Sequence, residues 1–299
     1  MTVAAAQLGD TLTEYVDRGF SGGLRVDGQP GGRFFFADGG VCGCETPGAP
    51  GLEVVLLRSG RVSEQGWNTA YAAAAVAGSP VTSALVTLEL LGAGETEALL
   101  RTALADAVFA ILSGQVGRWS PVPGADCPLP LSPGTHPGWV VAEARRRGQV
   151  LGSFPGPPLS PRDRPVAVYG ATSPARPPGP DSAELRALAN GRRTVRDLAF
   201  TRGRGLYETM LELARLRADN LVTFTSYQPE APSQHGIAGV PSEPRGNSAA
   251  PVLPQRHADR SGIPRSAEAG RRKLVAGIAL LRPRSAGRPG QDGRRDPSG

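Results

Sequence analysis

The last 72 residues set the strongest limit on what this chain can fold into. Residues 228–299 are rich in Pro, Gly and Ser, show no hydrophobic periodicity, and hold twelve basic and six acidic side chains. This tail therefore carries the whole formal net charge of +6. A segment that buries little apolar surface cannot offset the entropy lost on ordering. We predict a disordered tail at 228–299 and a folded, formally neutral part over residues 1–227.

Composition excludes secreted and membrane classes of protein. Three cysteines in 299 residues do not make a disulfide framework, which indicates a reducing compartment. No Lys or Arg precedes Arg18, so the basic start of a signal peptide is missing. No apolar stretch reaches the ~20 residues that a bilayer span needs. We predict a cytoplasmic protein that does not enter a membrane.

Alternating apolar residues and Asp-Gly pairs predict a three-stranded antiparallel meander over residues 23–46. The expected turns are Asp27-Gly28 and Asp38-Gly39, because Asp-Gly suits the positive φ angles of a type I′ turn. Helical patterns surround this sheet, and residues 117–122 can return beside it as a fourth strand. The expected helices cover residues 8–16, 50–57, 63–78, 82–91 and 95–112. Residues 1–120 therefore predict an α+β domain.

The next 60 residues, 121–180, are rich in proline and predict a linker with one short helix at 139–149. After it the helical pattern returns. Asp181 or Ser182 can cap a helix over 183–189. Thr194 and Asp197 can cap the next helix, over 195–201.

A third helix, over 206–218, and a strand, over 221–225, complete the folded part. Three helices, with a Gly-containing turn between the second and third, followed by a strand, are the order of a winged helix-turn-helix. The strand that should pair with 221–225 is not evident in the sequence. The expected fold class is thus α+β, with a small N-terminal antiparallel sheet and helices, a winged helix-turn-helix over 181–227 and the tail.

Two stretches resemble known bacterial families. Residues 22–45, with Gly23-Leu24-Arg25-Val26 and Phe34-Phe35-Phe36-Ala37-Asp38-Gly39, resemble a PATAN-type domain. Cys42 and Cys44 stand where that family often has alanine. Residues 185–222, above all "L-x-x-G-R-R-T-x-x-D-L-A", resemble the winged helix-turn-helix behind PATAN domains in regulator-like proteins of high-GC Gram-positive bacteria. The resemblance implies a transcription-regulator-like protein with an N-terminal sensory or docking domain and no catalysis.

The first functional hypothesis is a transcriptional regulator that binds double-stranded DNA. Arginines around the second helix and in the turn before the third would contact phosphates, and two residues of the third helix would lie nearest the bases. The predicted DNA-binding residues are Arg192, Arg193, Arg196, Arg202, Arg204, Thr209 and Arg215.

The same helix also supports an alternative. Glu208 and Glu212 stand four residues apart on one face and repel phosphate, and residues 181–224 carry only two excess positive charges. The alternative is a noncatalytic signalling adaptor whose winged helix binds protein. In both hypotheses residues 1–120 dock a protein partner or self-associate.

Signals for catalysis and metal binding are weak. His136, His235 and His257 lie in Pro-rich or disordered sequence, without the partners of a catalytic triad. Cys42 and Cys44 share one strand face and Cys127 is remote, so a four-ligand zinc site is not expected. We interpret the cysteines as small buried thiols and the run 145–147 of arginines as a solvated helix end. We predict no enzyme, no cofactor and no metal.

Overall fold

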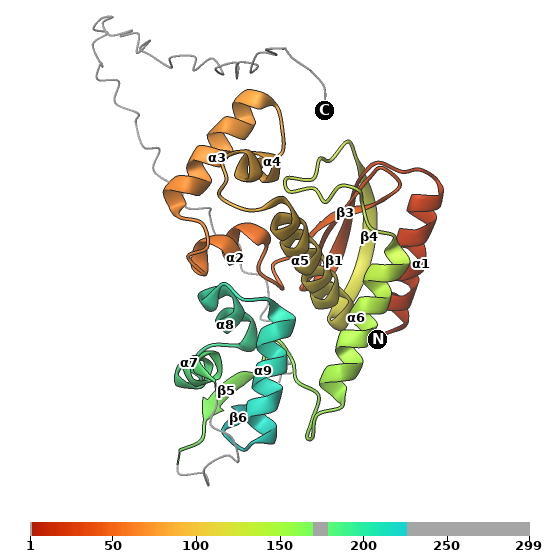
Figure 1. The fold of residues 1–299 in the computed structure, drawn as a ribbon. Coiled ribbons are helices and arrows are strands. Elements are labelled where there is room, and N and C mark those ends of the chain that lie inside the picture. Colours follow the sequence, from red (N-terminus) through yellow and green to blue (C-terminus); the bar gives the residue numbers. More distant parts are fainter. Residues whose placement is uncertain (1, 170–178, 226–299) are drawn as a thin grey trace, which may run out of the picture. The chain divides into compact units, whose positions relative to one another are not determined.

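A computed structural model describes residues 2–169 and 179–225 of the chain. The predicted tail, 228–299, lies outside the described residues. The described part is a mixed fold of helices and antiparallel strands, and its N-terminal portion is a small antiparallel sheet with helices, as the sequence predicts (Figure 1).

The N-terminal sheet has four antiparallel strands in the order β3-β2-β1-β4. The strands are β1 (Gly22–Gln29), β2 (Gly32–Ala37), β3 (Gly40–Glu45) and β4 (Gln115–Pro123). The predicted meander and the returning fourth strand are therefore confirmed. Asp38 and Gly39 have positive φ angles and join β2 to β3, as expected. The other predicted turn is wrong: Asp27 and Gly28 lie within β1, where its register against β4 shifts, and the chain turns at Pro30-Gly31 instead.

One face of this sheet packs against α1 (Val3–Asp17) and α5 (Ala93–Ser113). Phe36 lies against the aromatic rings of Tyr15 and Phe20, with ring centroids 5.8 and 5.7 Å away. Because side chains alternate along a strand, the same face also carries Phe34, which is fully buried. This layer forms the centre of the main hydrophobic core.

A second, smaller core lies among α2 (Leu52–Arg58), α3 (Glu64–Ala77) and α4 (Val81–Thr87). The ends of α3 follow the predicted pattern. The Ser63 hydroxyl accepts a hydrogen bond from the Gly66 N–H at 3.0 Å, and Gly78 ends the helix in the left-handed region. Local capping chemistry thus fixes this helix as the sequence indicates.

The predicted linker contains part of the core. Its helix, α6 (Pro137–Gly152), packs along α5 and α1 and buries Val140, Ala144 and Leu151. The Pro-rich chain before α6 is also bonded to the sheet, since Val41 and Thr135 exchange two backbone hydrogen bonds of 2.9 Å. The folded N-terminal portion therefore extends through residue 152. Val140, Ala144 and Leu151 are spaced by four and seven residues, which places them on one apolar face of α6.

After a connection over residues 153–163, the described chain forms the β5–β6 segment, which we define as residues 164–169 and 179–225. It contains β5 (Arg164–Ala167), α7 (Pro180–Leu188), α8 (Val195–Arg202), α9 (Leu206–Ala218) and β6 (Val222–Thr225). The partner strand of β6 is β5, which lies before the three helices in sequence and pairs antiparallel with it.

The predicted start is confirmed for α8 and is wrong for α7. The predicted capping box of α8 is present: Thr194 Oγ1 and Asp197 Oδ2 each accept the other residue's N–H, both at 3.1 Å. Helix α7 begins after Gly179 instead of being capped by Asp181 or Ser182, because Pro180 fits the first helical position.

Among the described residues, no single helix has the length and apolar character to cross a bilayer. Helices α3 and α4 reach that length and hydropathy when taken together, but they are bent by 113° at the break between them.

Phe34→Ala should lower the free energy of unfolding by about 3–5 kcal/mol, because it removes a fully buried ring from the main core. Urea-induced unfolding followed by circular dichroism measures this loss. Val76→Ala, at an exposed site of α3, is the control and should change stability by less than about 0.5 kcal/mol. Equal effects of the two substitutions would contradict this core.

Candidate functional site

The candidate site is a junction where α5, α6 and α9 meet, and its centre is a buried ion pair. Asp106 of α5 pairs with Arg147 of α6, and their side chains are only 3 % and 9 % exposed. Asp106 lies in an otherwise apolar stretch of its helix, between Ala105 and Ala107. A buried charge is costly unless it is paired and hydrogen-bonded, so the neighbours of this pair decide whether the arrangement is stable.

Helix α9 supplies some of those neighbours. The Tyr207 N–H donates to Asp106 Oδ1 at 3.4 Å, at the N-terminal end of α9, where a carboxylate is favourable. The Arg147 guanidinium lies over the Tyr207 ring, 4.8 Å from its centroid. The same ring meets Phe109 of α5 edge-on, with centroids 5.8 Å apart. The carboxylate and the guanidinium are therefore both shared between the N-terminal portion and the β5–β6 segment.

A second carboxylate completes the junction. Arg147 Nε donates to Glu143 Oε1 at 2.8 Å, and Arg146 donates to both oxygens of Glu143 at 2.7 Å. These hydrogen bonds, Arg146 first and then Arg147, lower the pKa of Glu143 to about 2. Burial acts in the opposite direction on Asp106 and raises its pKa above the usual range, although Arg147 partly offsets the effect. We define the junction as Asp106, Phe109, Glu143, Arg147 and Tyr207.

Sequence reasoning missed the junction because it interpreted residues 145–147 as a solvated helix end. Arg147 is buried, so that interpretation is wrong for this residue. Two features of the sequence nevertheless indicate that Arg147 and Asp106 are buried. Arg147 falls on the same helical stripe as Val140, Ala144 and Leu151, and Asp106 is the lone acid between Thr102 and Ser113.

The predicted phosphate-binding arginines mostly have protein partners. Arg202 is 6 % exposed and lies 3.3 Å from Glu184 of α7. Arg204 lies 3.4 Å from Asp181 and 3.6 Å from Glu208. These contacts direct both guanidinium groups toward acidic side chains of the β5–β6 segment itself.

Arg196 turns toward the N-terminal portion. Its Nε donates to the Pro47 carbonyl at 2.5 Å, and its guanidinium lies 5.0 Å from the centre of the Phe200 ring. Arg192 and Arg193 are exposed in the loop before α8. Both side chains are accessible to a partner.

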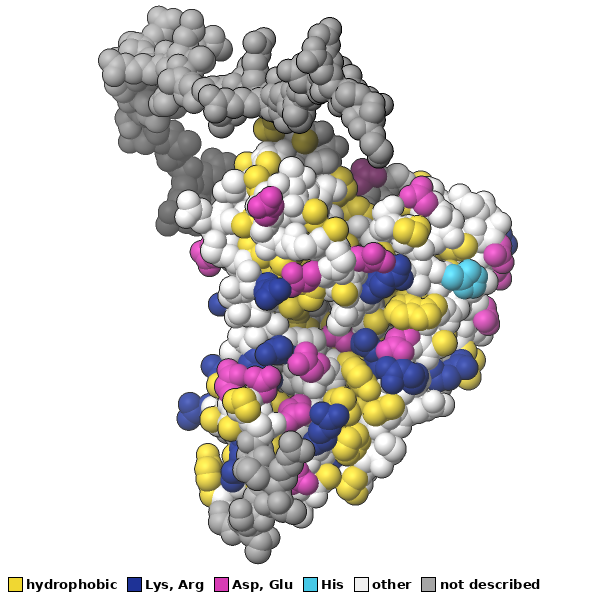
Figure 2. All heavy atoms as spheres, in the orientation of Figure 1, with side chains coloured by type: hydrophobic (Ala, Val, Ile, Leu, Met, Phe, Trp, Pro, Cys, Tyr) yellow, Lys and Arg dark blue, Asp and Glu magenta, His cyan; other side chains and the backbone are white. Residues whose placement is uncertain are grey.

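The predicted base contacts also differ from expectation. Thr209 is 1 % exposed and its hydroxyl donates to the Gly205 carbonyl at 2.9 Å, so the prediction that it lies near bases is wrong. Arg215 is exposed and pairs with Glu212 at 3.3 Å. On the face shown in Figure 2, basic and acidic side chains are mixed and do not gather by sign. The seven predicted residues therefore do not combine into one basic surface.

A helix-turn-helix contacts base edges through the N-terminal residues of its recognition helix, while the helix before it crosses the DNA backbone. In the predicted order these helices are α9 and α8, and the N-terminal ends of both face other parts of the same molecule: α8 faces the Pro47 loop, and α9 faces Asp106. The turn between α8 and α9 also lies against another part of the chain, the C-terminal end of α2. Gly203 has a φ of +61°, and a Cβ on it would lie 2.7 Å from both Arg58 Cβ and the Ser59 nitrogen. Only glycine satisfies this conformation and this close approach together.

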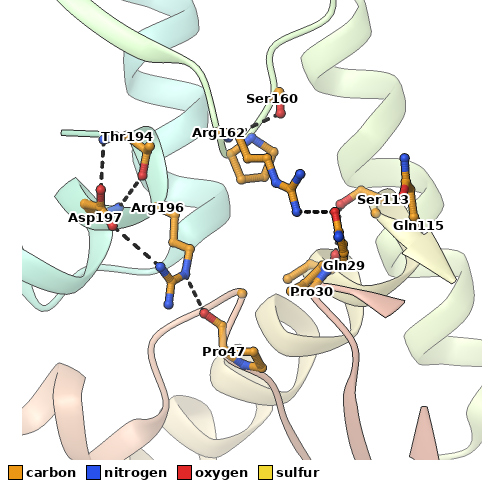
Figure 3. A pocket seen from close by; sticks show the side chains of 14 residues that line it. Gln29, Pro30, Pro47, Ser113, Gln115, Ser160, Arg162, Thr194, Arg196 and Asp197 are labelled. Carbon is orange, nitrogen blue, oxygen red and sulfur yellow. Dashed lines mark hydrogen bonds and ion pairs between the residues drawn. The ribbon is translucent and has the colours of Figure 1, made fainter. Parts of the chain in front are cut away.

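A cleft of about 550 Å³ lies between the β1–β2 turn, the C-terminal end of α5 and the start of α8. Figure 3 shows Arg162 and Arg196 reaching toward Gln29 and Pro47, and Arg162 Nη2 donates to Gln29 Oε1 at 2.8 Å. The carboxylate of Asp197 is also part of the lining. The cleft thus combines both signs of charge.

Among residues 2–169 and 179–225, no three His, Cys, Asp or Glu side chains lie together in a way that could hold a metal ion. No family model, curated protein or solved structure matches the chain. The contacts at the junction are therefore the basis for a functional proposal.

Asp106→Ala should lower the free energy of unfolding by about 3–5 kcal/mol, because it leaves Arg147 charged and buried without its partner. Arg147→Met should be similarly costly, and the double variant should lose clearly less than the sum of the two. Urea-induced unfolding of all three variants gives this coupling. Arg146→Met, at an exposed arginine of the same helix, is the control and should cost less than about 1 kcal/mol. Additive losses would show that the pair is not coupled.

Stability should fall at acid pH through Glu143. Its folded-state pKa of about 2 lies below the ordinary value of 4.5, so its contribution is present above pH 4.5 and is lost as pH falls toward 2. Urea-induced unfolding at pH 5 and at pH 2.5 should show a smaller loss of stability for Glu143→Gln than for the unsubstituted chain. The same loss in both proteins would contradict this assignment.

Proposed function

We propose that the protein is a noncatalytic signalling adaptor that binds a partner protein through its N-terminal portion, while the β5–β6 segment is held against that portion by protein contacts. The observation that carries the proposal is the junction, where the N-terminal end of α9 is already bound to α5 and α6 through Asp106, Arg147 and Tyr207. A surface that reads DNA has to leave this helix end free. Tyrosine and arginine are also enriched at protein–protein interfaces.

The N-terminal portion would then dock the partner protein, in the manner of the PATAN-type domain that residues 22–45 resemble. Its α3–α4 pair offers a surface for this contact. From Gln65 to Leu88 there is no charged side chain, yet Tyr71 and Val76 of α3 are 61 % and 90 % exposed. A contiguous apolar surface without charges is typical of a protein contact, and on this proposal Tyr71 and Val76 belong to such a surface. The partner on this proposal is a protein with an uncharged, apolar contact face.

The test uses the full chain, immobilised and exposed to nuclease-treated lysate. A partner should be retained by the unsubstituted chain and lost with Tyr71→Glu or Val76→Glu, which place a carboxylate on the proposed contact face. Val3→Glu, at an exposed valine of α1, is the matched control and should retain the partner. Circular dichroism checks that each variant is folded. Retention that is the same for all four proteins, or absent from all of them, would contradict the proposal.

The same variants separate docking of another protein from self-association. Sedimentation of the purified chain over a range of concentrations should give a single mass. A mass that grows with concentration, and that returns to one chain with Val76→Glu, would show instead that the α3–α4 pair binds a second copy.

The second candidate function is a DNA-binding transcriptional regulator. The observation in its favour is the order α7-α8-α9-β6 with a capping box on α8, together with the exposure of Arg192 and Arg193. The test is fluorescence anisotropy of the full chain with random duplex DNA at two salt concentrations. A regulator should lose affinity for all sequences, and its salt dependence should become flatter, when Arg192 and Arg193 are both changed to Ala. The adaptor proposal expects no effect, because any remaining affinity would come from the twelve basic residues of the tail.

A further inference from the structure

Two of the three cysteines, distant in sequence, lie side by side in the sheet region. Cys42 is in β3 at an irregular point of the β2–β3 ladder: Phe36 pairs with Val41, and Phe35 pairs with Gly43, so Cys42 is the extra residue of a β-bulge. A bulge redirects the side chain that it contains. The strict alternation that places Cys42 and Cys44 on one face is therefore interrupted here.

The chain after β4 brings Cys127 to this bulge. Leu131 N–H donates to the Cys42 carbonyl at 2.8 Å, which holds the loop along β3. The Cys127 thiol donates a long hydrogen bond to the same carbonyl oxygen, with 3.9 Å between sulfur and oxygen, so the Cys127 side chain lies beside Cys42. The prediction that Cys127 is remote is wrong in space, although it is correct in sequence.

Gly43 makes room for this sulfur. A Cβ at position 43 would overlap Cys127 Sγ, so the absence of a side chain there is what lets the thiol approach the strand. The two thiols also differ chemically. The hydrogen bond from Cys127 lowers the pKa of Cys42, whereas the same contact and burial raise that of Cys127. The thiolate, and thus the nucleophile, is favoured at Cys42.

Cys44, two residues after Cys42 in β3, differs from Cys42 in its surroundings and in the direction of its pKa shift. Its cross-strand partner is Phe34, and it packs against the main core. Burial raises the pKa of Cys44 well above the usual range. A thiol that is held in its neutral form reacts slowly with oxidants.

We propose that Cys42 and Cys127 are a redox modification site that closes to an intramolecular disulfide when the chain meets a peroxide, while Cys44 stays a thiol. Cys42 Sγ, as thiolate, attacks one peroxide oxygen, the O–O bond breaks, and Cys42 becomes a sulfenic acid while one water forms with the proton that Cys42 released. Cys127 Sγ then attacks the Cys42 sulfur, and the S–O bond breaks. The hydroxyl leaves as a second water with the Cys127 proton. Two thiols are oxidised by two electrons and one hydrogen peroxide is reduced to two waters.

The disulfide would join β3 covalently to the loop between β4 and α6. That loop is already bonded to β3 at Leu131 and Thr135, so the new bond needs little rearrangement of the backbone. A dithiol reductant would reopen it by thiol–disulfide exchange.

The test is a count of free thiols in the folded full chain before and after treatment with hydrogen peroxide. Each sample is then unfolded in urea and alkylated, so that buried thiols react too. Alkylation should label three cysteines before peroxide treatment, one after it, and three again after reduction. Cleavage after arginine places Cys42 and Cys44 in the peptide 34–58 and Cys127 in the peptide 119–145. Mass spectrometry should find these two peptides joined. Three labelled cysteines after peroxide, or peptides joined only between two chains, would overturn the proposal.

Matched serine variants identify the sulfur in peptide 34–58. Cys44→Ser should keep the joined peptides, and Cys42→Ser should abolish them. In Cys127→Ser the sulfenic acid should persist at Cys42, where dimedone traps it. Joined peptides that survive in Cys42→Ser and vanish in Cys44→Ser would assign the disulfide to Cys44 and refute the role of Cys42. The wild-type peptide map needs no variant, so it decides whether the disulfide forms even if a substitution impairs folding.

Discussion

The buried pair of Asp106 and Arg147 is the interaction on which the arrangement of α5, α6 and α9 depends. Each charge has lost nearly all of its water and has further partners besides the other: Asp106 at the N-terminal end of α9, and Arg147 at Glu143 of its own helix and at the Tyr207 ring of α9. A buried pair of this kind contributes little net stability compared with apolar residues of the same volume, but separating it is costly. The pair therefore favours one position of α9, because a displaced α9 would remove the Tyr207 N–H from Asp106 and the Tyr207 ring from Arg147.

Part of the fold could be predicted from the sequence because its signals are local. The meander, both ends of α3 and the capping box of α8 were predicted correctly, since each depends on residues within a few positions of one another. Asp38-Gly39, Ser63 and Thr194 carry their structural signal locally. The turn at Asp27-Gly28 failed because the local signal competes with a β-bulge against β4, a strand almost ninety residues away in sequence.

The features that sequence reasoning missed all depend on distant partners. Helix α6 belongs to the core because α1 and α5 cover its stripe, and β5 exists as a strand because β6 returns beside it. Among the predicted site residues, Arg202 and Thr209 were assigned by their position in a motif. Their actual environment is set by α7 and by the packing of α9. A motif can place a residue on a helix, but it does not say which surface that helix presents once the rest of the chain has folded.

The pairing of β5 with β6 has a mechanical consequence. Arg164 and Thr225 are direct cross-strand partners, so the chain enters and leaves the β5–β6 segment at neighbouring points, about 5 Å apart. Tension applied between the N-terminal portion and the chain beyond Thr225 would act on this pair first. The two strands would separate one hydrogen bond at a time from that end, while the contacts of α8 and α9 with the N-terminal portion share the load. The β5–β6 segment is thus a loop closed by the pairing of its two terminal strands, and the Arg164–Thr225 end of that pairing is where separation under force would begin.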